Sequence, residues 1–159
     1  MHIRLTETAD WMLLKQTRLA ALLDTPTAFG VSYQTAAQYT DEQWKERASS
    51  AGTAFWLAFD GDRPIGMVGA AVGGEGRYCL IGMWVERAVR GSGVAAGLVE
   101  AVKARAEVIG VDGVYLDVCP ENARAANFYL RQGFVFLDEW EPLESHPHIW
   151  VQAMYWAVG

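Results

Sequence analysis

The chain has 159 residues, of which 52% are hydrophobic and 20% charged, and its formal net charge is −6 at pH 7. This balance is typical of a globular protein, and the length suits a single domain over residues 1–159 with a substantial core. The acidic charge argues against a nucleic-acid partner, which requires a basic surface. No apolar run approaches the roughly 18 residues of a membrane span, and residues 1–5 do not resemble a signal peptide, so we expect a cytoplasmic protein without a membrane partner.

The first quarter of the chain predicts a strand, a helix and an irregular segment. Residues 2–5 form the strand, and Thr6 or Thr8 can cap the helix that follows. This helix ends before Pro26, because proline cannot continue a helix. Residues 26–40 have no clear hydrophobic period, so we expect a loop or a short helix there.

A helix and a hairpin are predicted next. Thr40 and Gln43 stand at the spacing of a capping box, which predicts the start of a short helix. Residues 54–59 are apolar and predict a buried strand. The pair Asp60-Gly61 favours a tight turn, so residues 65–72 should return beside that strand as its antiparallel partner.

The most informative stretch joins an apolar strand to a helix through two glycines. Residues 79–85 are apolar, Gly91 and Gly93 bracket a serine, and apolar residues recur at helical spacing from Val94 onward. Glycines let successive backbone N–H groups point into one concavity, where the positive end of the helix dipole adds to them. Such a concavity binds phosphate, although a plain turn between a strand and a helix can have the same glycines.

The same glycines also fit the dinucleotide-binding pattern G-x-G-x-x-A, and Asp117 follows at about the spacing that this pattern requires. Two features count against it. Residues 86–90 separate the strand from the glycines, whereas in the dinucleotide fold the strand runs almost directly into them. The chain after the helix start is also too short for the remaining strands and a substrate domain.

The rest of the chain completes a mixed sheet. We expect the helix to end at about Gly110 and a strand to follow at 113–118. Glu121 or Asn122 should cap the next helix, and Gly133 should end it. A strand at 134–137, an acidic loop at 138–148 and a closing strand at 149–158 complete the chain. Antiparallel strands followed by a strand, helix, strand unit predict an α/β sheet with helices on it. Cys79 and Cys119 should be small buried side chains, and no Cys or His spacing indicates a metal.

Two motifs resemble one family. Residues 90–95, Arg-Gly-Ser-Gly-Val-Ala, resemble the Gln/Arg-x-x-Gly-x-Gly/Ala signature of the GCN5-related N-acetyltransferases (GNAT). Residues 122–134 resemble the family's second signature, an Asn followed by Ala, then an aromatic-Tyr pair and Gly-Phe. The motifs stand in the family's order and spacing. The resemblance implies a GNAT fold, with a mostly antiparallel central sheet that is splayed between the fourth and fifth strands and flanked by helices.

The resemblance implies that acetyl coenzyme A is the acetyl donor. Its pyrophosphate would meet the backbone N–H groups of residues 90–96, and its pantetheine arm would pair with the main chain of residues 83–85. An N–H group at Val85 or its neighbour would stabilise the oxyanion. The predicted coenzyme contacts are Met83, Trp84, Val85, Arg90, Gly91, Ser92, Gly93, Val94, Ala95, Ala96 and Asn122.

The resemblance also implies catalytic roles. Tyr129 stands where the family has the acid for the leaving thiolate, and a tyrosine with a pKa near about 10 is protonated at neutral pH. Asp117 stands where some protein N-terminal acetylating members have Glu, so it is a candidate base. The aspartate side chain is one methylene shorter than glutamate. Proton transfer from the amine through a water molecule is therefore equally open. The other candidate bases are Glu75, Glu86, His146 and His148.

The acceptor side is the least determined by the sequence. By resemblance, Phe29 and Tyr33 are candidate pocket residues, and the acidic residues 138–144 flank an acceptor site and would attract an ammonium group. We expect direct attack, in a ternary complex, by a primary amine of a small molecule. A protein N-terminal or lysine acetyltransferase and a non-catalytic coenzyme A sensor are the alternatives. Dimerisation is common in the family, and the apolar residues 149–158 could take part in a homodimer.

Overall fold

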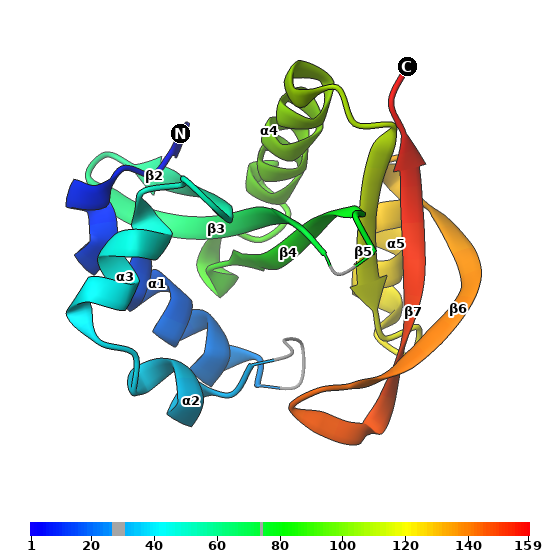
Figure 1. Ribbon diagram of the computed structural model, residues 1–159, viewed down its shortest axis with the longest axis horizontal. Coiled ribbons are helices and arrows are strands. Elements are labelled where there is room, and N and C mark those ends of the chain that lie inside the picture. The colour runs from blue at the N-terminus through cyan, green and yellow to red at the C-terminus, as the bar shows by residue number, and fades with distance from the viewer. Residues whose placement is uncertain (27–30, 74) are drawn as a thin grey trace.

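The structure is a computed structural model that describes residues 1–26, 31–73 and 75–159. Its strands form one seven-stranded sheet in the order β1-β2-β3-β4-β5-β7-β6 (Figure 1). Only β4 and β5 are parallel among the described neighbours, and the other pairs are antiparallel. The strands are β1 (His2–Leu5), β2 (Ala54–Asp60), β3 (Arg63–Val72), β4 (Tyr78–Val85), β5 (Gly113–Val118), β6 (Val135–Leu143) and β7 (His146–Ala157).

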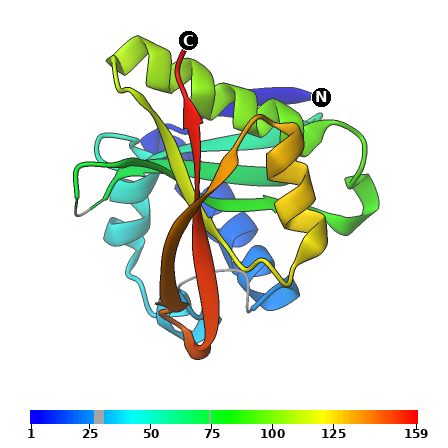
Figure 2. The same ribbon diagram turned by 90° about the vertical axis from the view of Figure 1, so that its right-hand side faces the viewer.

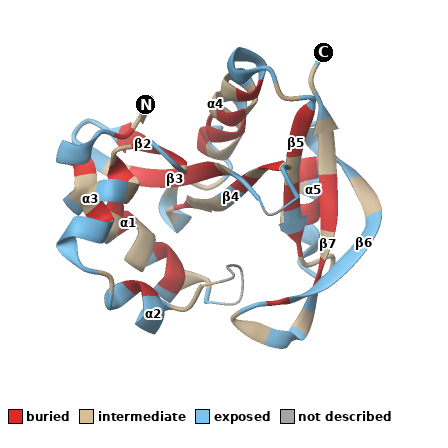
Figure 3. Cartoon of the chain, viewed as in Figure 1, coloured by how far each residue is buried: buried red, intermediate tan, exposed pale blue. Residues whose placement is uncertain are grey.

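Helices pack on both faces of this sheet and confirm the predicted α/β class. They are α1 (Trp11–Asp24), α2 (Tyr33–Ala37), α3 (Asp41–Ala48), α4 (Val94–Ile109) and α5 (Ala123–Arg131), with short 3-10 helices η1 (Thr8–Asp10) and η2 (Arg87–Val89). One buried cluster joins α1, α2 and α3 to β2, around Trp44 and Leu57. A second cluster joins α4 and α5 to β2–β5, around Leu98 and Tyr129. Figure 3 shows that the buried residues concentrate on the strands between these helices.

The helix starts in the first half of the chain follow the sequence with one exception. Thr40 accepts from the backbone N–H of Gln43, and Gln43 accepts from that of Thr40, so the predicted capping box is present. The predicted cap at Thr6 or Thr8 is wrong. Instead, the Asp10 carboxylate accepts the backbone N–H of Glu7 at 2.8 Å, and η1 precedes α1. Asp10 takes this role because its carboxylate can satisfy a backbone N–H group at the helix start.

The acidic segment predicted as a loop at 138–148 is a β-hairpin, and that prediction was wrong. β6 continues to Leu143 and β7 starts at His146, earlier than the predicted closing strand, so only Glu144 and Ser145 form the turn (Figure 2). Among the described strands, β6 pairs with β7 alone. It is largely exposed, so it lacks the apolar alternation of a strand with one buried face. Its charged residues are those of an edge strand.

The sheet separates between β4 and β5, as predicted. A single pair, Cys79 with Tyr115, joins these two strands. On its other edge, β4 contains a bulge, because its pairing with β3 skips one residue on β3 but two residues on β4 between Ile81 and Trp84. Gly82 lies in this bulge with φ +61°, a conformation that side chains rarely adopt. The divergence and the bulge together leave an opening at the middle of the molecule.

Candidate active site

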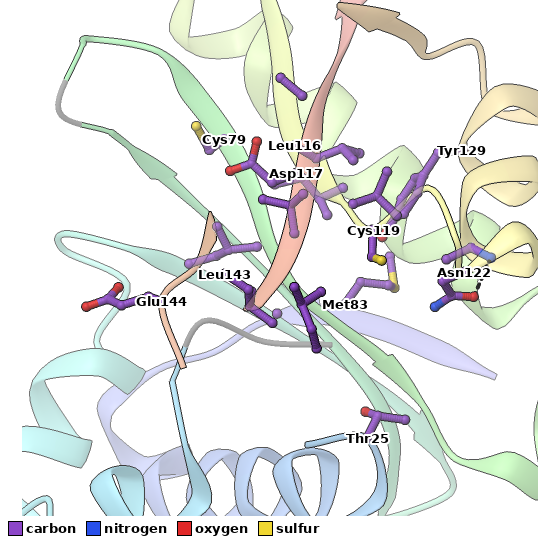
Figure 4. Close-up of a pocket in the computed structure, with 18 of the residues that line it drawn as sticks. Thr25, Cys79, Met83, Leu116, Asp117, Cys119, Asn122, Tyr129, Leu143 and Glu144 are labelled. Carbon is purple, nitrogen blue, oxygen red and sulfur yellow. Dashed lines mark hydrogen bonds between the residues drawn. The ribbon is translucent and has the colours of Figure 1, made fainter. Parts of the chain in front are cut away.

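A cleft of about 1620 Å³ lies where β4 and β5 separate. Four parts of the chain that are distant in sequence meet around it, as Figure 4 shows: Met83 of β4, Asp117 of β5, Tyr129 of α5, and the turn of the β6–β7 hairpin with Glu144. Thr25, directly after α1, lies below them. The cleft is large enough to hold two substrates at once, since ligand pockets are commonly about 300–1,000 Å³.

The loop before α4 presents unused hydrogen-bond donors. Gly91 has φ +82° and Gly93, the N-cap of α4, has φ +92° and no side chain to cap the helix. Among the described residues, none accepts from the backbone N–H groups of Gly91, Gly93, Val94, Ala95 or Ala96. A Cβ atom built on either glycine would meet nothing within 4 Å. Open space, free N–H groups and the positive end of a 16-residue helix fit a pyrophosphate.

The edge of β4 that faces β5 is largely unpaired and could bind an extended ligand. Beyond Cys79, no described residue of β5 pairs with this edge, yet Met83, Trp84 and Val85 line the cleft. An amide-bearing chain can satisfy such an edge by adding to it as a further strand. The pantetheine contact predicted at residues 83–85 therefore has an unpaired strand edge to use.

Asp24 ties the end of α1 to the segment before the glycine loop. Its carboxylate accepts from the indole N–H of Trp84 at 3.1 Å and from the guanidinium groups of Arg87 and Arg90, both at 2.7 Å. The hydrogen bond from Trp84 first, then those from the two arginines, hold the pKa of Asp24 at about 2. Arg90 also donates to the backbone oxygen of Val85 at 2.8 Å. These bonds fix β4 against the loop that follows it.

Carboxylates gather on the opposite wall. Glu141 of β6 lies beside Asp117 and acts on its protonation, and the charge of Arg77 acts on the same group. Arg77 binds Glu139 at 2.7 Å and lies 4.4 Å from the ring centre of Tyr115. Partial loss of hydration in the cleft, and then the neighbouring Glu141, raise the pKa of Asp117 to about 6. A carboxylate with a pKa near neutrality is suited to accept a proton.

Tyr129 reaches the same space from α5. Its side chain is buried and packs on the rings of Phe128 and Phe134. Burial raises the pKa of its phenol, so the hydroxyl keeps its proton at neutral pH. Asn122 caps α5 by accepting the backbone N–H of Ala125 at 3.2 Å, and it lines the cleft as well. The cleft thus contains one group able to take a proton, on β5, and one able to donate a hydrogen bond, on α5.

The structure places some of the other predicted site residues away from the cleft. Phe29 is outside the described residues. Tyr33, the first residue of α2, is exposed and does not line the cleft. Glu86 pairs with Arg63 away from the cleft. The remaining candidate bases divide between two places: Glu75 lines the cleft and pairs with Arg77, whereas His146 and His148 pack on each other in β7 outside it.

The two cysteines differ from the prediction of buried side chains. Cys79 and Cys119 are free thiols, half-buried, and both line the cleft. Burial and the charge of Asp117 raise the pKa of the Cys79 thiol. In the described part of the chain, no three Cys, His, Asp or Glu side chains are arranged to hold a metal ion. No described helix is both long and apolar enough to cross a membrane.

Sequence reasoning missed the groups that support the predicted ones. Asp24, Arg77 and Arg18 line the cleft but belong to no motif. Glu139 and Glu141 are two residues apart, which places them on one face of a strand. The resemblance already implies that residues 138–144 flank the acceptor site, but interpreting them as a loop hides the spacing that places Glu139 and Glu141 on one face of a strand.

A sequence profile of the acetyltransferase (GNAT) family matches residues 18–134. A search of curated proteins gave no match. Among solved structures, a GNAT-family acetyltransferase from Streptococcus pneumoniae is 20% identical with a TM-score of 0.80, covering 99% of each chain. An aminoglycoside 6′-acetyltransferase type Ii is 18% identical with a TM-score of 0.74, covering 100% of this chain and 98% of that one.

A third solved structure contains the expected donor. It is a protein assigned as a streptothricin acetyltransferase from Bacillus anthracis str. Ames, in complex with acetyl coenzyme A. It is 19% identical with a TM-score of 0.63, covering 72% of this chain and 67% of that one. At these identities the likeness of the three structures concerns the fold.

Proposed function

The chain belongs to the acetyltransferase (GNAT) family, a family of N-acetyltransferases, and we propose that it acetylates a primary amine of a small molecule with acetyl coenzyme A as the donor. The observation that carries the proposal is the shared cleft. The open edge of β4, beside the free N–H groups that begin α4, lies across the same space from Asp117 and Tyr129. A donor held on the first side would have its reactive end between a base and an acid.

The donor supplies a thioester whose carbonyl carbon an amine can attack. The chain's task on the donor side is positioning, because holding two reactants in one geometry can supply about 7–11 kcal/mol of the barrier. The backbone of residues 91–96 would bind the pyrophosphate, and residues 83–85 would bind the pantetheine arm. The N–H group of Val85 or its neighbour would donate to the carbonyl oxygen as negative charge develops there.

The acceptor amine must lose its proton, because an ammonium group has no lone pair for attack. Asp117 would take this proton, directly or through a water molecule. With a pKa of about 6 it is ionised at neutral pH and is a stronger base than an ordinary aspartate. Glu141 contributes to the raised pKa of Asp117, because its negative charge disfavours a second carboxylate and its oxygens can accept from the protonated form.

Tyr129 would act on the departing thiolate. Because burial raises its pKa, the phenol stays protonated and would stabilise the thiolate mainly as a hydrogen-bond donor. The phenolate of Tyr129 is a stronger base than the thiolate of coenzyme A. If the hydroxyl gives its proton to the sulfur, the phenolate must therefore regain a proton from solvent. This role requires the hydroxyl group alone and not the packing of the ring.

The charges of the cleft support a cationic small molecule as acceptor. Glu139, Glu141 and Glu144 line the wall beside Asp117, and carboxylates concentrate ammonium groups by long-range attraction. The ends of α1 and of the β6–β7 hairpin both border the cleft, which favours a compact acceptor over an extended peptide. Two structural neighbours are named for acetylation of antibiotics, streptothricin and aminoglycosides, which agrees with a small acceptor.

The proposal is tested by thiol release from acetyl coenzyme A. The purified protein is mixed with the donor and with a panel of small amines, and in parallel with peptides that have free N-termini or lysines. We expect release that depends on a small amine and scales with its concentration. Release with peptides alone would favour the protein acetyltransferase, and tight donor binding without release from any acceptor would favour a sensor.

A further inference from the structure

A second, smaller cavity lies behind one wall of the cleft. It has a volume of about 170 Å³, and its lining includes residues of α1, α2, α3, β2 and β4. Figure 1 shows that these helices lie on the face of the sheet opposite α4. Arg18, Val31 and Ile81 line both spaces. The cavity is therefore next to the cleft in which the proposed reaction takes place, and a ligand in the cleft can extend a short group toward it.

The lining of this cavity has a distinct charge. Of its ten described lining residues two are arginines, Arg18 and Arg47, and none is Asp or Glu. Arg18 runs against the bulge of β4, because a Cβ atom on Gly82 would stand 2.7 Å from its guanidinium nitrogen. Burial lowers the pKa of Arg18, and the charge of Arg47 acts in the same direction. A negatively charged group in this cavity would be attracted by both arginines.

Trp44 adds a neutral donor to the same cavity. The side chain is 1% exposed, and its indole N–H has no acceptor among the described residues. Buried polar groups nearly always have a hydrogen-bond partner, so a ligand atom that accepts from this N–H group would be stabilised here. Arg47 lies over the ring of Tyr39 at 4.0 Å and near that of Trp44 at 5.9 Å, which holds its charge at the rim.

We propose that this cavity receives the carboxylate of the acceptor, so that the substrate is a small compound with both an amine and a carboxylate. The inference rests on the proposed function and narrows its substrate class. The two walls of the active site then have opposite charge: Asp117 and Glu141 face the ammonium end, and Arg18 with the N–H group of Trp44 faces the anionic end. The cavity has room for a carboxylate and a short apolar spacer, against Phe55 and Ile81.

Matched pairs of acceptors test this inference. L-lysine is compared with cadaverine, and phenylalanine with phenethylamine, because each pair differs only by a carboxylate. We expect kcat/KM to be about tenfold or more higher for the carboxylated member of each pair, since its carboxylate can accept from the N–H group of Trp44 and is attracted by the arginines, whereas the amine alone offers no acceptor. In Arg18→Gln and Trp44→Phe this ratio should fall toward one, whereas in Arg131→Gln, a charge removed from the exposed end of α5, it should persist.

Trp44→Phe keeps an aromatic ring in the core but removes the N–H group together with the five-membered ring, so its unfolding temperature is measured beside its kcat/KM ratio, and it tests the inference even where Arg18→Gln fails to fold. Equal kcat/KM within both pairs, or a preference that neither variant reduces, would overturn the inference while amine-dependent thiol release still supports the proposed function. Absence of release with all four amines would remove the proposed function and the inference together.

Discussion

The proposed donor site and the proposed acceptor site use different kinds of chemical group. On the donor side, the groups expected to bind are backbone N–H groups at Gly91, Gly93 and the first turn of α4, with the open edge of β4. On the acceptor side they are side chains, among them Asp117, Glu141 and Tyr129, from three separate elements. A backbone site depends on where the chain can bend, and a side-chain site depends on which elements the fold brings together. The four predictions below test this contrast.

The largest effect is expected for Gly93→Val. The position has φ +92° and open space around its missing Cβ atom, so a valine side chain would both strain the loop and enter the predicted pyrophosphate site. We expect calorimetric titration to show a loss of acetyl coenzyme A affinity of about 100-fold or more, equal to about 3 kcal/mol. Gly110→Val is the matched control, because Gly110 ends the same helix with φ +77° and equally open space. It should unfold at a similarly lowered temperature while binding the donor normally.

Tyr129→Phe should reduce turnover without weakening the donor site. Removal of a hydrogen-bond donor or acid from the transition state lowers kcat by about 100-fold, and the Kd for acetyl coenzyme A should stay within about twofold. Tyr78→Phe is the control, since Tyr78 is also a buried tyrosine with a raised pKa, its hydroxyl has no partner among the described residues, and it does not line the cleft. Full activity of Tyr129→Phe would remove the acid role.

The pH profile tests the acceptor side. The pKa of Asp117 is raised, so its ionised form disappears as the pH falls through about 6. We expect kcat/KM at pH 5 to be about tenfold below its plateau, because about one tenth of the carboxylate is then ionised. Glu141→Gln should move this acidic limb to lower pH, since it removes the negative neighbour that raises the pKa of Asp117. Glu144→Gln, on the same hairpin, should leave the limb in place.

The smallest effect is expected for Asp24→Asn. The ion pairs with Arg87 and Arg90 are partly exposed, so their loss should cost about 1 kcal/mol and raise the KM for acetyl coenzyme A about fivefold, with little change in kcat. The lowered pKa adds a stability test. Wild type should lose this stabilisation as the pH falls from about 4 toward 2, because Asp24 is then protonated, and the variant should not. Glu86→Gln, which removes a nearby ion pair outside the cleft, should leave the KM unchanged.

The contrast between a backbone site and a side-chain site also explains what the sequence could predict. The glycine loop and the helix caps at Thr40 and Asn122 are local features, because each depends on residues close together in the chain. The family motifs point to the same segments. The contact of Asp117 with Glu141 depends instead on the pairing of β5 with β7 and of β7 with β6, which no local pattern specifies.

The hairpin of residues 135–157 shows why the acceptor side was harder to predict. Its charges resemble those of a solvated loop, and only pairing with β7 makes β6 a strand. Asp24 is a similar case, since it ends a helix with no motif and acquires its three partners 60 or more residues later in the chain. Groups of this kind depend on tertiary structure and must be read from the fold.

The most direct test of the account is a crystal structure of the chain with coenzyme A. We expect pyrophosphate oxygens at about 2.9 Å from the backbone nitrogens of the glycine loop and the first turn of α4, with the pantetheine arm along residues 83–85 of β4. The sulfur should then lie between Asp117 and Tyr129. A coenzyme bound elsewhere, or one that leaves the N–H groups of Gly91 and Gly93 without contact, would contradict the assignment of the donor site.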